Sequence, residues 1–229
     1  MSEERWPGRW IDDHAVFGET VDRYLEPGAV VLDAGAGRGV RYRYDYSSQV
    51  ARVVGVDVDP GIAHNRNVDE RVLGNLAALP FADATFDLVF SKYVFEHLDR
   101  PRRTFRELRR VMKPSGHLVF HTPNLYHYVA WGAMVTPQRF HVWFNGKRGC
   151  DSSDIFPTRY RANDRRTIHR LAAEAGFRVV DLKLIEPKPD YLHFHPLAYR
   201  AGVAYERLVN VSERLADLRC VIVGDLVAV

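Results

Sequence analysis

Short apolar runs rich in β-branched residues alternate with longer amphipathic segments along the first half of the chain. Because these runs are apolar at nearly every position, they are typical of parallel strands that helices cover on both faces. After Pro101, the apolar residues Phe105, Leu108 and Met112 fall on one face and predict a helix. The alternation of strands and helices predicts an α/β fold with a Rossmann-like, doubly wound sheet. The expected strands are AVVLDA (29–34), RVVGVD (52–57), RVLG (71–74), FDLVFS (86–91) and HLVFHT (117–122).

The second half of the chain departs from this pattern. The span 123–162 contains proline, glycine and many aromatic residues without a clean period, so we expect an insertion or lid over the sheet. Asn163 is expected to cap a helix that ends at Gly176. Two further β-rich runs without a parallel crossover predict an antiparallel pair at one edge of a seven-stranded, mostly parallel sheet. These runs are RVVDLKLIEP (178–187) and CVIVGDLVAV (220–229), with a helix between them near 198–217. No linker or repeat is evident, so we expect a single domain over residues 1–229.

Composition narrows the class of protein. The chain has 229 residues, of which 46% are hydrophobic and 27% charged, as in ordinary globular proteins. The net charge of +3 is too weak to predict binding to nucleic acid. No apolar run approaches the ~20 residues that span a bilayer, and the first ten residues lack the apolar core of a signal peptide. With only Cys150 and Cys220 available for disulfides, we expect a cytoplasmic protein with reduced thiols.

A glycine-rich turn follows the first expected strand. In VVLDAGAGRG (30–39), Gly35, Gly37 and Gly39 form G-x-G-x-G, and Asp33 precedes them. Glycines allow a tight turn and a close approach of the backbone to a ligand, and this is where open α/β sheets bind ligands. The dinucleotide fingerprint needs a glycine where Val40 stands, which disfavours a nicotinamide dehydrogenase. An acidic residue before the turn suits a ligand with an ammonium group, although an ordinary strand-to-helix turn is the alternative.

An aspartate at the end of the second expected strand strengthens the case for a cofactor. GVDVDP (55–60) places Asp57 about 20 residues after the glycine turn, where a carboxylate can accept hydrogen bonds from both ribose hydroxyls. Charge-assisted bonds of this kind are stronger than neutral ones. A solvated aspartate at a strand end is the alternative.

Together these motifs resemble class I S-adenosylmethionine-dependent methyltransferases, from about residue 29 to residue 124. VLDAGAGRG is similar to the first motif of that family, and GVDVDP is similar to its acidic second-strand motif. Residues 74–98 are similar to the stretch through the adenine site and the fourth strand. Residues 108–124, LRRVMKPSGHLVFHTPN, resemble the small-molecule branch that quinone-biosynthesis enzymes typify. The resemblance implies a methyltransferase (EC 2.1.1.-) that uses S-adenosyl-L-methionine; a cofactor-binding regulatory protein without transferase activity is the alternative.

The resemblance also implies which residues bind the cofactor. From the methionine end to the adenine end, these are Asp33, the backbone of Gly35, Ala36 and Gly37, then Asp57 on the ribose, and Val58, Asn75 and Leu76 around the adenine. Ser91 and Lys92 would line the methionine and the path to the acceptor. Two departures stand out: Asn75 occupies a position where the family usually has aspartate, and RYRYDYSSQ (41–49) replaces a plain amphipathic helix.

Methyl transfer requires alignment of the acceptor and, if the acceptor is a hydroxyl, removal of its proton. His121 ends the fifth expected strand at the ligand-binding edge and is the candidate base, with a structural histidine as the alternative. His97 is interpreted as part of the scaffold, whereas His127 and His141 lie near the expected mouth. His193 and His195 alone do not predict a metal site.

The segment 124–170 is expected to select the acceptor. It combines aromatic residues with eight Lys and Arg against three Asp. This composition fits a small-molecule acceptor with an apolar body and an anionic group, such as a phosphorylated or lipid-linked sugar. It would also allow peripheral contact with an anionic membrane. A solvated helical surface is the alternative, and the oligomeric state is open.

Overall fold

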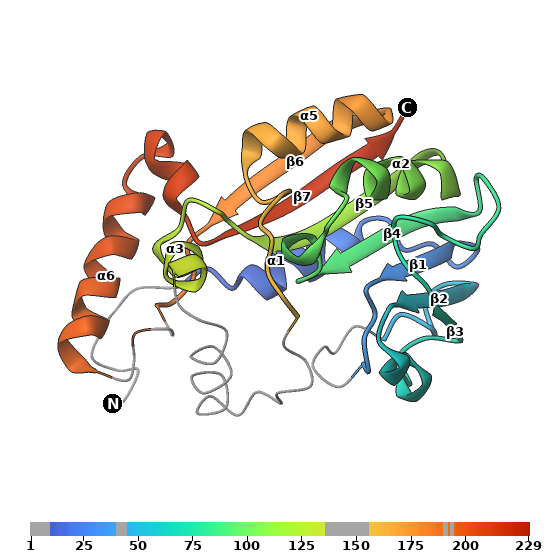
Figure 1. Cartoon of the computed structure of the whole chain (residues 1–229), viewed down its shortest axis with the longest axis horizontal. Helices are drawn as coiled ribbons and strands as arrows, with labels where there is room; N and C mark the ends of the chain where they lie inside the picture. The colour runs from blue at the N-terminus through green and yellow to red at the C-terminus, as the bar shows by residue number, and fades with distance from the viewer. Residues whose placement is uncertain (1–9, 40–44, 136–155, 190–191, 193–194) are drawn as a thin grey trace.

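The structure of the chain is a computed structural model that describes residues 10–39, 45–135, 156–189, 192 and 195–229. Seven strands of the described part form one sheet in the order β3-β2-β1-β4-β5-β7-β6 (Figure 1). The strands are β1 (Val30–Ala34), β2 (Arg52–Asp57), β3 (Glu70–Leu73), β4 (Phe86–Lys92), β5 (Met112–Pro123), β6 (Phe177–Ile185) and β7 (Val221–Ala228). The α-helices are α1 (Asp13–Asp22), α2 (Pro101–Val111), α3 (Tyr128–Val135), α5 (Arg165–Ala175) and α6 (Pro196–Asn210). Short 3₁₀ helices are η2 (Pro60–His64), η3 (Phe95–His97) and η6 (Glu213–Leu218).

The sheet confirms the expected doubly wound α/β architecture. β1 pairs in parallel with β2 and β4, and the parallel pairing continues outward to β3 and β5. β7 runs antiparallel to both β5 and β6. The last strand of the chain is therefore inserted between β5 and β6, and β6 forms the edge.

Helices pack on both faces of the sheet, which explains why its strands are apolar almost throughout. Phe17 and Val21 of α1 join one core cluster, whereas Phe105 of α2 and Ile168 of α5 join the cluster on the opposite face. α2 and α5 lie side by side (Figure 1). The carboxyl ends of β1, β2, β4 and β5 are thus held at one edge by a rigid scaffold.

The start of α5 corrects one expectation. Asn163 does not cap the helix; the side chain of Asp164 accepts from Thr167 N–H at 2.9 Å. Asn163 is buried instead, and its amide donates to Thr122 Oγ1 at 2.7 Å and to Pro123 O at 2.9 Å. The side chain of Asn163, which local propensity favours as the N-cap of α5, therefore makes tertiary hydrogen bonds instead. The helix ends, as expected, at Gly176, whose φ is 88°.

Two other segments differ from simple expectation. The helix expected near 198–217 is divided into α6 and η6. Residues 47–49, which belong to the departure noted from the family pattern, form a turn. None of the helices in the described ranges has the length and apolar character needed to cross a membrane.

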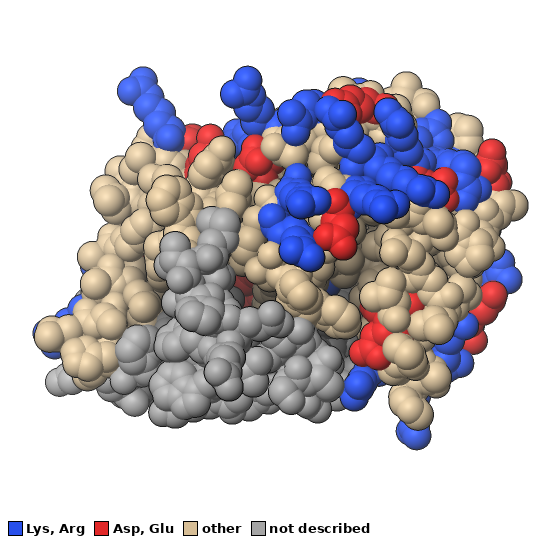
Figure 2. All heavy atoms as spheres, viewed as in Figure 1, with Lys and Arg blue, Asp and Glu red and all other residues tan. Residues whose placement is uncertain are grey.

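Positive charge is concentrated over α2 and α5. Figure 2 shows Lys and Arg side chains gathered on this surface, with a few acidic side chains among them. Residues 100–113 and 159–178 carry thirteen Lys and Arg against three acidic residues, a net +10 in a chain whose total is +3. We call this surface the basic face.

Candidate active site

The glycine turn after β1 has left-handed backbone angles at all three of its glycines, Gly35, Gly37 and Gly39, and two of them are also closely packed. Gly35 has φ +89° and Gly39 has φ +70°, both in the left-handed region. A Cβ atom at Gly35 would lie 2.2 Å from Val94 Cγ2, and one at Gly39 would lie 2.2 Å from Asn65 Oδ1. Close packing against the two neighbouring loops therefore selects glycine at both positions.

Asp57 fixes the glycine turn to the end of β2. Its Oδ2 accepts from Gly37 N–H at 2.8 Å and its Oδ1 accepts from Asp59 N–H at 2.8 Å. Each carboxylate oxygen keeps a second lone pair, and the side chain is only half-buried. Asp57 can therefore hold the turn and still accept hydrogen bonds from a ligand.

Asn65 is a second anchor of the turn that sequence analysis missed. Its Nδ2 donates to Ala36 O at 2.9 Å and to Gly37 O at 3.2 Å, and the residue is 1% exposed. The sequence around it, directly after η2, carries no motif that would have drawn attention to this role.

Asp33 places a second carboxylate beside the turn. It is half-buried at the end of β1, and within the described ranges its side chain has no hydrogen bond or ion pair. Burial, together with the nearby charge of Asp57, raises the pKa of Asp33 to about 8. A cation bound here would offset both the loss of hydration and the repulsion from Asp57, and would therefore favour the ionised carboxylate of Asp33.

The residues expected around the adenine lie at the ends of β2 and β3. Val58 is 54% exposed and can pack against a flat ring, whereas the side chain of Leu76 is buried in the core. Asn75 is exposed, and its Oδ1 accepts from Ala77 N–H at 2.8 Å. One lone pair of that oxygen is thus used within the turn.

Ser91 and Lys92 end β4 with their side chains on opposite faces. Ser91 Oγ donates to Ala34 O at 2.7 Å and ties β4 to β1 beside the glycine turn. Lys92 Nζ contacts His14 Nδ1 of α1 and is 7% exposed. Burial lowers the pKa of Lys92 to about 8, although the charges of Asp13 and Asp12 oppose this.

His121 lies near the carboxyl end of β5 in a buried polar cluster. Its Nε2 is 2.6 Å from Asp13 Oδ2, and its Nδ1 has no hydrogen-bond partner among the described residues. The ring of Tyr93 packs edge-on against it, with ring centroids 4.6 Å apart. Burial lowers the pKa of His121, assisted by the charges of Lys92 and His14, although Asp13 opposes the shift.

Asp13 was not among the residues expected from the sequence. Burial alone would raise the pKa of Asp13, but the hydrogen bond and charge of His121, with the charge of His14, lower it. Asp13 is therefore ionised at neutral pH and accepts from His121 Nε2–H. This orientation leaves the lone pair of a neutral imidazole on Nδ1.

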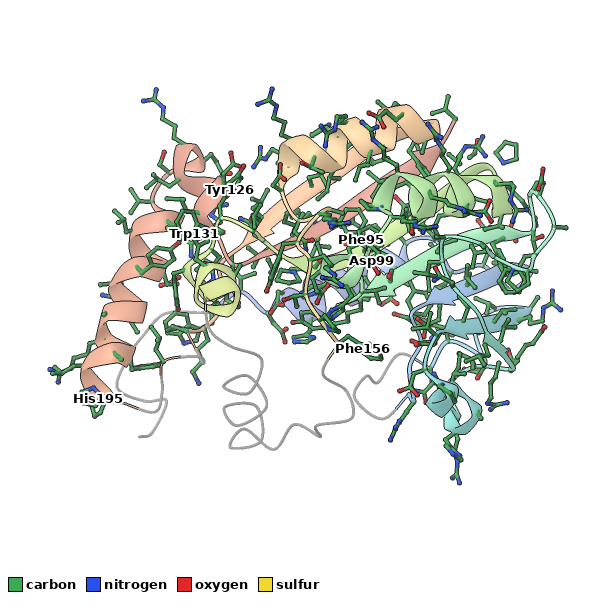
Figure 3. The ribbon with its side chains drawn as sticks, in the orientation of Figure 1. Phe95, Asp99, Tyr126, Trp131, Phe156 and His195 are labelled. Carbon is green, nitrogen blue, oxygen red and sulfur yellow. The ribbon has the colours of Figure 1, made fainter. Side chains whose placement is uncertain are left out.

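The remaining histidines separate into different surroundings. His97 Nδ1 is 3.0 Å from Pro157 O, and its ring lies 5.9 Å from that of Phe156. His127 is buried beside Glu186. His195 is exposed and directly precedes α6 (Figure 3), whereas the expectations for residues 141 and 193 fall outside the described ranges.

The described ends of the aromatic insertion expose large rings. Tyr126, Trp131 and Phe156 are 48%, 59% and 39% exposed, and Figure 3 shows Trp131 on α3 with Tyr126 close to the same helix. The other aromatic residues of the insertion, between 136 and 155, lie outside the described residues. Exposed aromatic side chains near the carboxyl edge of the sheet can pack an apolar ligand.

The residues beside the glycine turn fit S-adenosylmethionine. Asp33 offers an unpaired carboxylate for an ammonium group, and Asp57 retains acceptor capacity for ribose hydroxyls. A Cβ atom at Gly37 would meet nothing closer than Asp57 Oδ2 at 4.0 Å, so the backbone there is open to a ligand.

Comparison with known proteins agrees with this chemistry. Residues 32–120 match the family model described as a methyltransferase domain, which covers the glycine turn, Asp57 and β4 to β5. Residues 32–120 therefore form a methyltransferase domain of the class I, S-adenosylmethionine-dependent type. S-adenosylmethionine is therefore the cofactor of this methyltransferase.

Relatives of this methyltransferase differ in length and chemistry. An Encephalitozoon cuniculi protein named as a methyltransferase is 29% identical over 206 residues, which are 78% of this chain and 90% of that protein. The malonyl-[acyl-carrier protein] O-methyltransferase of Hahella chejuensis is 37% identical over 99 residues, which are 40% of this chain and 36% of that enzyme. This methyltransferase spans about one third to one half of the length of the other curated relatives it matches.

A solved structure extends the similarity in fold to nearly the whole methyltransferase. The geranyl diphosphate C-methyltransferase from Streptomyces coelicolor has a TM-score of 0.58 at 17% identity, covering 94% of this chain and 77% of that one. One relative is named for methylation at oxygen and this structure for methylation at carbon. Family membership therefore leaves the acceptor atom open.

Proposed function

We propose that this methyltransferase methylates a hydroxyl oxygen of a small-molecule acceptor, which can be a sugar or a lipid-linked compound, with His121 as the general base. The cofactor supplies an activated methyl group on a sulfonium. The observation that supports the proposal is the Asp13–His121 pair, with 2.6 Å between Asp13 Oδ2 and His121 Nε2 and an unpartnered Nδ1. Methylation of nitrogen or carbon would require the removal of a proton from a different kind of group.

The pair suits removal of a hydroxyl proton. As the new O–CH₃ bond forms and the S–CH₃ bond breaks, the hydroxyl proton passes to His121 Nδ1, and S-adenosylhomocysteine leaves. Asp13 holds the ring and stabilises the imidazolium that results. Because burial lowers the pKa of His121, the neutral base persists below the usual pH range of imidazole.

Lys92 is proposed to assist at the same place. Its charge is close enough to His121 to lower the pKa of the imidazole. A cation in this buried position stabilises negative charge as it develops on the acceptor oxygen.

The cofactor contacts are proposed as the sequence predicts them. Asp33 and the backbone of the glycine turn bind the methionine end, and Asp57 binds the ribose hydroxyls. Val58, Asn75 and the backbone of Leu76 border the adenine. The exposed rings of Tyr126 and Trp131 support an acceptor with an apolar part, and the excess of Lys and Arg in the segment 124–170 supports an anionic part. The same features support peripheral contact with an anionic membrane.

The affinity for S-adenosylhomocysteine should rise with pH until about pH 8. In the protein without ligand, Asp33 is mostly protonated below this pH because its pKa is about 8. Binding of the ammonium group favours the carboxylate, so the complex holds fewer protons than the free protein, and higher pH favours binding by at most about tenfold per pH unit. Calorimetry across this range on wild type and Asp33→Asn measures the effect. Equal pH dependence in both proteins would remove Asp33 from the ammonium site.

The proposed reaction is tested by incubation of the chain and S-adenosylmethionine with a panel of alcohols, sugars, amines, carboxylates and activated carbon acids. Mass spectrometry of the products and the release of S-adenosylhomocysteine are the readouts. We expect methyl ethers. Methylation only at nitrogen or carbon would refute the oxygen assignment, and binding without release would favour a regulatory protein.

A further inference from the structure

Three buried side-chain atoms in the described part of the chain have no hydrogen-bond partner. They are His121 Nδ1, His127 Nε2 and Glu186 Oε2. Native proteins leave few such atoms unpaired, and each one calls for an explanation. All three belong to two imidazole–carboxylate pairs, Asp13–His121 and Glu186–His127.

Both pairs lie at the edge of the sheet where the reaction is proposed. His121 is opposite Val223 on β7, and Glu186 directly follows Ile185, which is opposite Val221. The two positions are three residues apart along the strand direction, roughly 10 Å at about 3.4 Å per residue, and β7 separates them across the sheet by two strand spacings, also roughly 10 Å.

The thiol of Cys220 is influenced by the carboxylates of both pairs. Burial raises the pKa of Cys220, and the charges of both Glu186 and Asp13 raise it further. One buried thiol therefore lies within electrostatic reach of both carboxylates.

The Glu186–His127 pair is close but incompletely hydrogen-bonded. His127 Nε2 and Glu186 Oε1 are 3.3 Å apart, and both side chains are 2% exposed. Val129 N–H donates to His127 Nδ1 at 3.4 Å, which leaves the proton of the neutral imidazole on Nε2. The pair thus presents one donor, His127 Nε2–H, beside one acceptor, Glu186 Oε2.

We propose that Glu186 and His127 bind a second hydroxyl group of the acceptor, which makes the acceptor a polyhydroxylated compound such as a sugar or a cyclitol. The inference rests on the proposed function, because His121 receives the proton of the hydroxyl that is methylated. A hydroxyl accepts from His127 Nε2–H and donates to Glu186 Oε2. An ammonium group has no lone pair to accept with, and a phosphate or carboxylate is repelled by Glu186. Any anionic group of the acceptor therefore binds elsewhere.

The test is an NMR titration of the chain, labelled with ¹³C-histidine and saturated with S-adenosylhomocysteine. The probes are methyl α-glucopyranoside and myo-inositol, with cyclohexanol and cyclohexanecarboxylate as ring-matched compounds that lack the second hydroxyl. The His127 signal is assigned by its loss in His127→Gln. We expect the polyols to shift the His121 and His127 signals together, and the two control compounds to leave His127 unmoved.

A charge-removing variant measures the contribution of the carboxylate. Glu186→Gln should weaken polyol binding by roughly tenfold or more while leaving the affinity for S-adenosylhomocysteine unchanged. Glu206→Gln on α6, whose side chain accepts from Asn210 at 2.8 Å, is the matched control and should bind like wild type. The wild-type titration stands even if Glu186→Gln fails to fold.

The outcomes separate this inference from the proposed function. If no polyol moves the His127 signal up to its solubility limit, the pair holds only an ordered water, and the inference is refuted. It is also refuted if a polyol is methylated with equal rate and KM by wild type and Glu186→Gln, although the proposed function then stands. Polyol binding at both histidines without methyl transfer to any acceptor would keep the subsite and refute the proposed function.

Discussion

Replacement of His121 by alanine is expected to lower kcat by about 10²- to 10⁴-fold, the usual contribution of a general base. The affinity for S-adenosylhomocysteine should not change, because no cofactor contact is proposed for this side chain. Initial rates with the acceptor identified by product analysis, together with calorimetry, measure the two quantities. Added imidazole should restore part of the rate by occupying the space of the missing ring, which a purely structural role would not explain.

His169→Ala is the matched control, because His169 is exposed on α5 on the other face of the sheet. It should retain wild-type activity. A second variant, Asp13→Asn, keeps the shape of the pair but removes the charge that stabilises the imidazolium, so kcat should fall without a large change in KM. An unchanged kcat in His121→Ala, with the thermal midpoint preserved, would assign the histidine to the scaffold.

Asp57→Ala is expected to weaken cofactor binding by about 1–3 kcal/mol, the typical loss when hydrogen bonds to a charged group are removed. This corresponds to roughly 5- to 150-fold in Kd. Two effects contribute, because the ribose loses its partner and the Gly37 N–H loses the carboxylate that fixes the turn. Calorimetric titration with S-adenosylhomocysteine measures the loss.

Asp57→Asn separates the two effects. The amide keeps one oxygen as an acceptor but carries no charge, so its Kd should fall between wild type and alanine. Glu70→Gln, at an exposed carboxylate paired with Arg52 at 3.4 Å, is the control and should bind normally. Wild-type affinity in Asp57→Ala would mean that another group binds the ribose.

The strands and the glycine turn could be predicted because their signals are local. A buried parallel strand is apolar along its length, and the positive φ values at Gly35 and Gly39 leave a trace in the sequence as glycine itself. The order of the last two strands in the sheet could not be predicted in the same way. Two consecutive β-rich runs predict an antiparallel pair, but only the packing of the whole sheet places β7 between β5 and β6.

The polar partners in the site are non-local, which is why they were missed. Asp13 and His121 are 108 residues apart in the chain and meet only because α1 packs against β5 and β7. Asn65 follows η2 and Glu186 follows β6, and no sequence motif surrounds either residue, so neither could be singled out from the sequence. A non-local contact also explains why Asn163 does not cap α5. Its side chain is suited to an N-cap, but it donates a hydrogen bond to Thr122 in the core. The proposed roles of the cofactor-binding residues stay predictions until the variants are measured.

The basic face affects how the protein is oriented when it encounters a charged surface or molecule. With net +10 on two segments and +3 in total, the remaining residues sum to −7, so the chain carries a large permanent dipole moment. In the field of an anionic surface, or of another copy, such a dipole experiences a torque before any atoms touch. The torque is short-ranged in physiological salt, where charges are screened over about 8 Å, and reaches further in dilute buffer. Collisions with anionic bodies are therefore biased toward one orientation, with α2 and α5 leading.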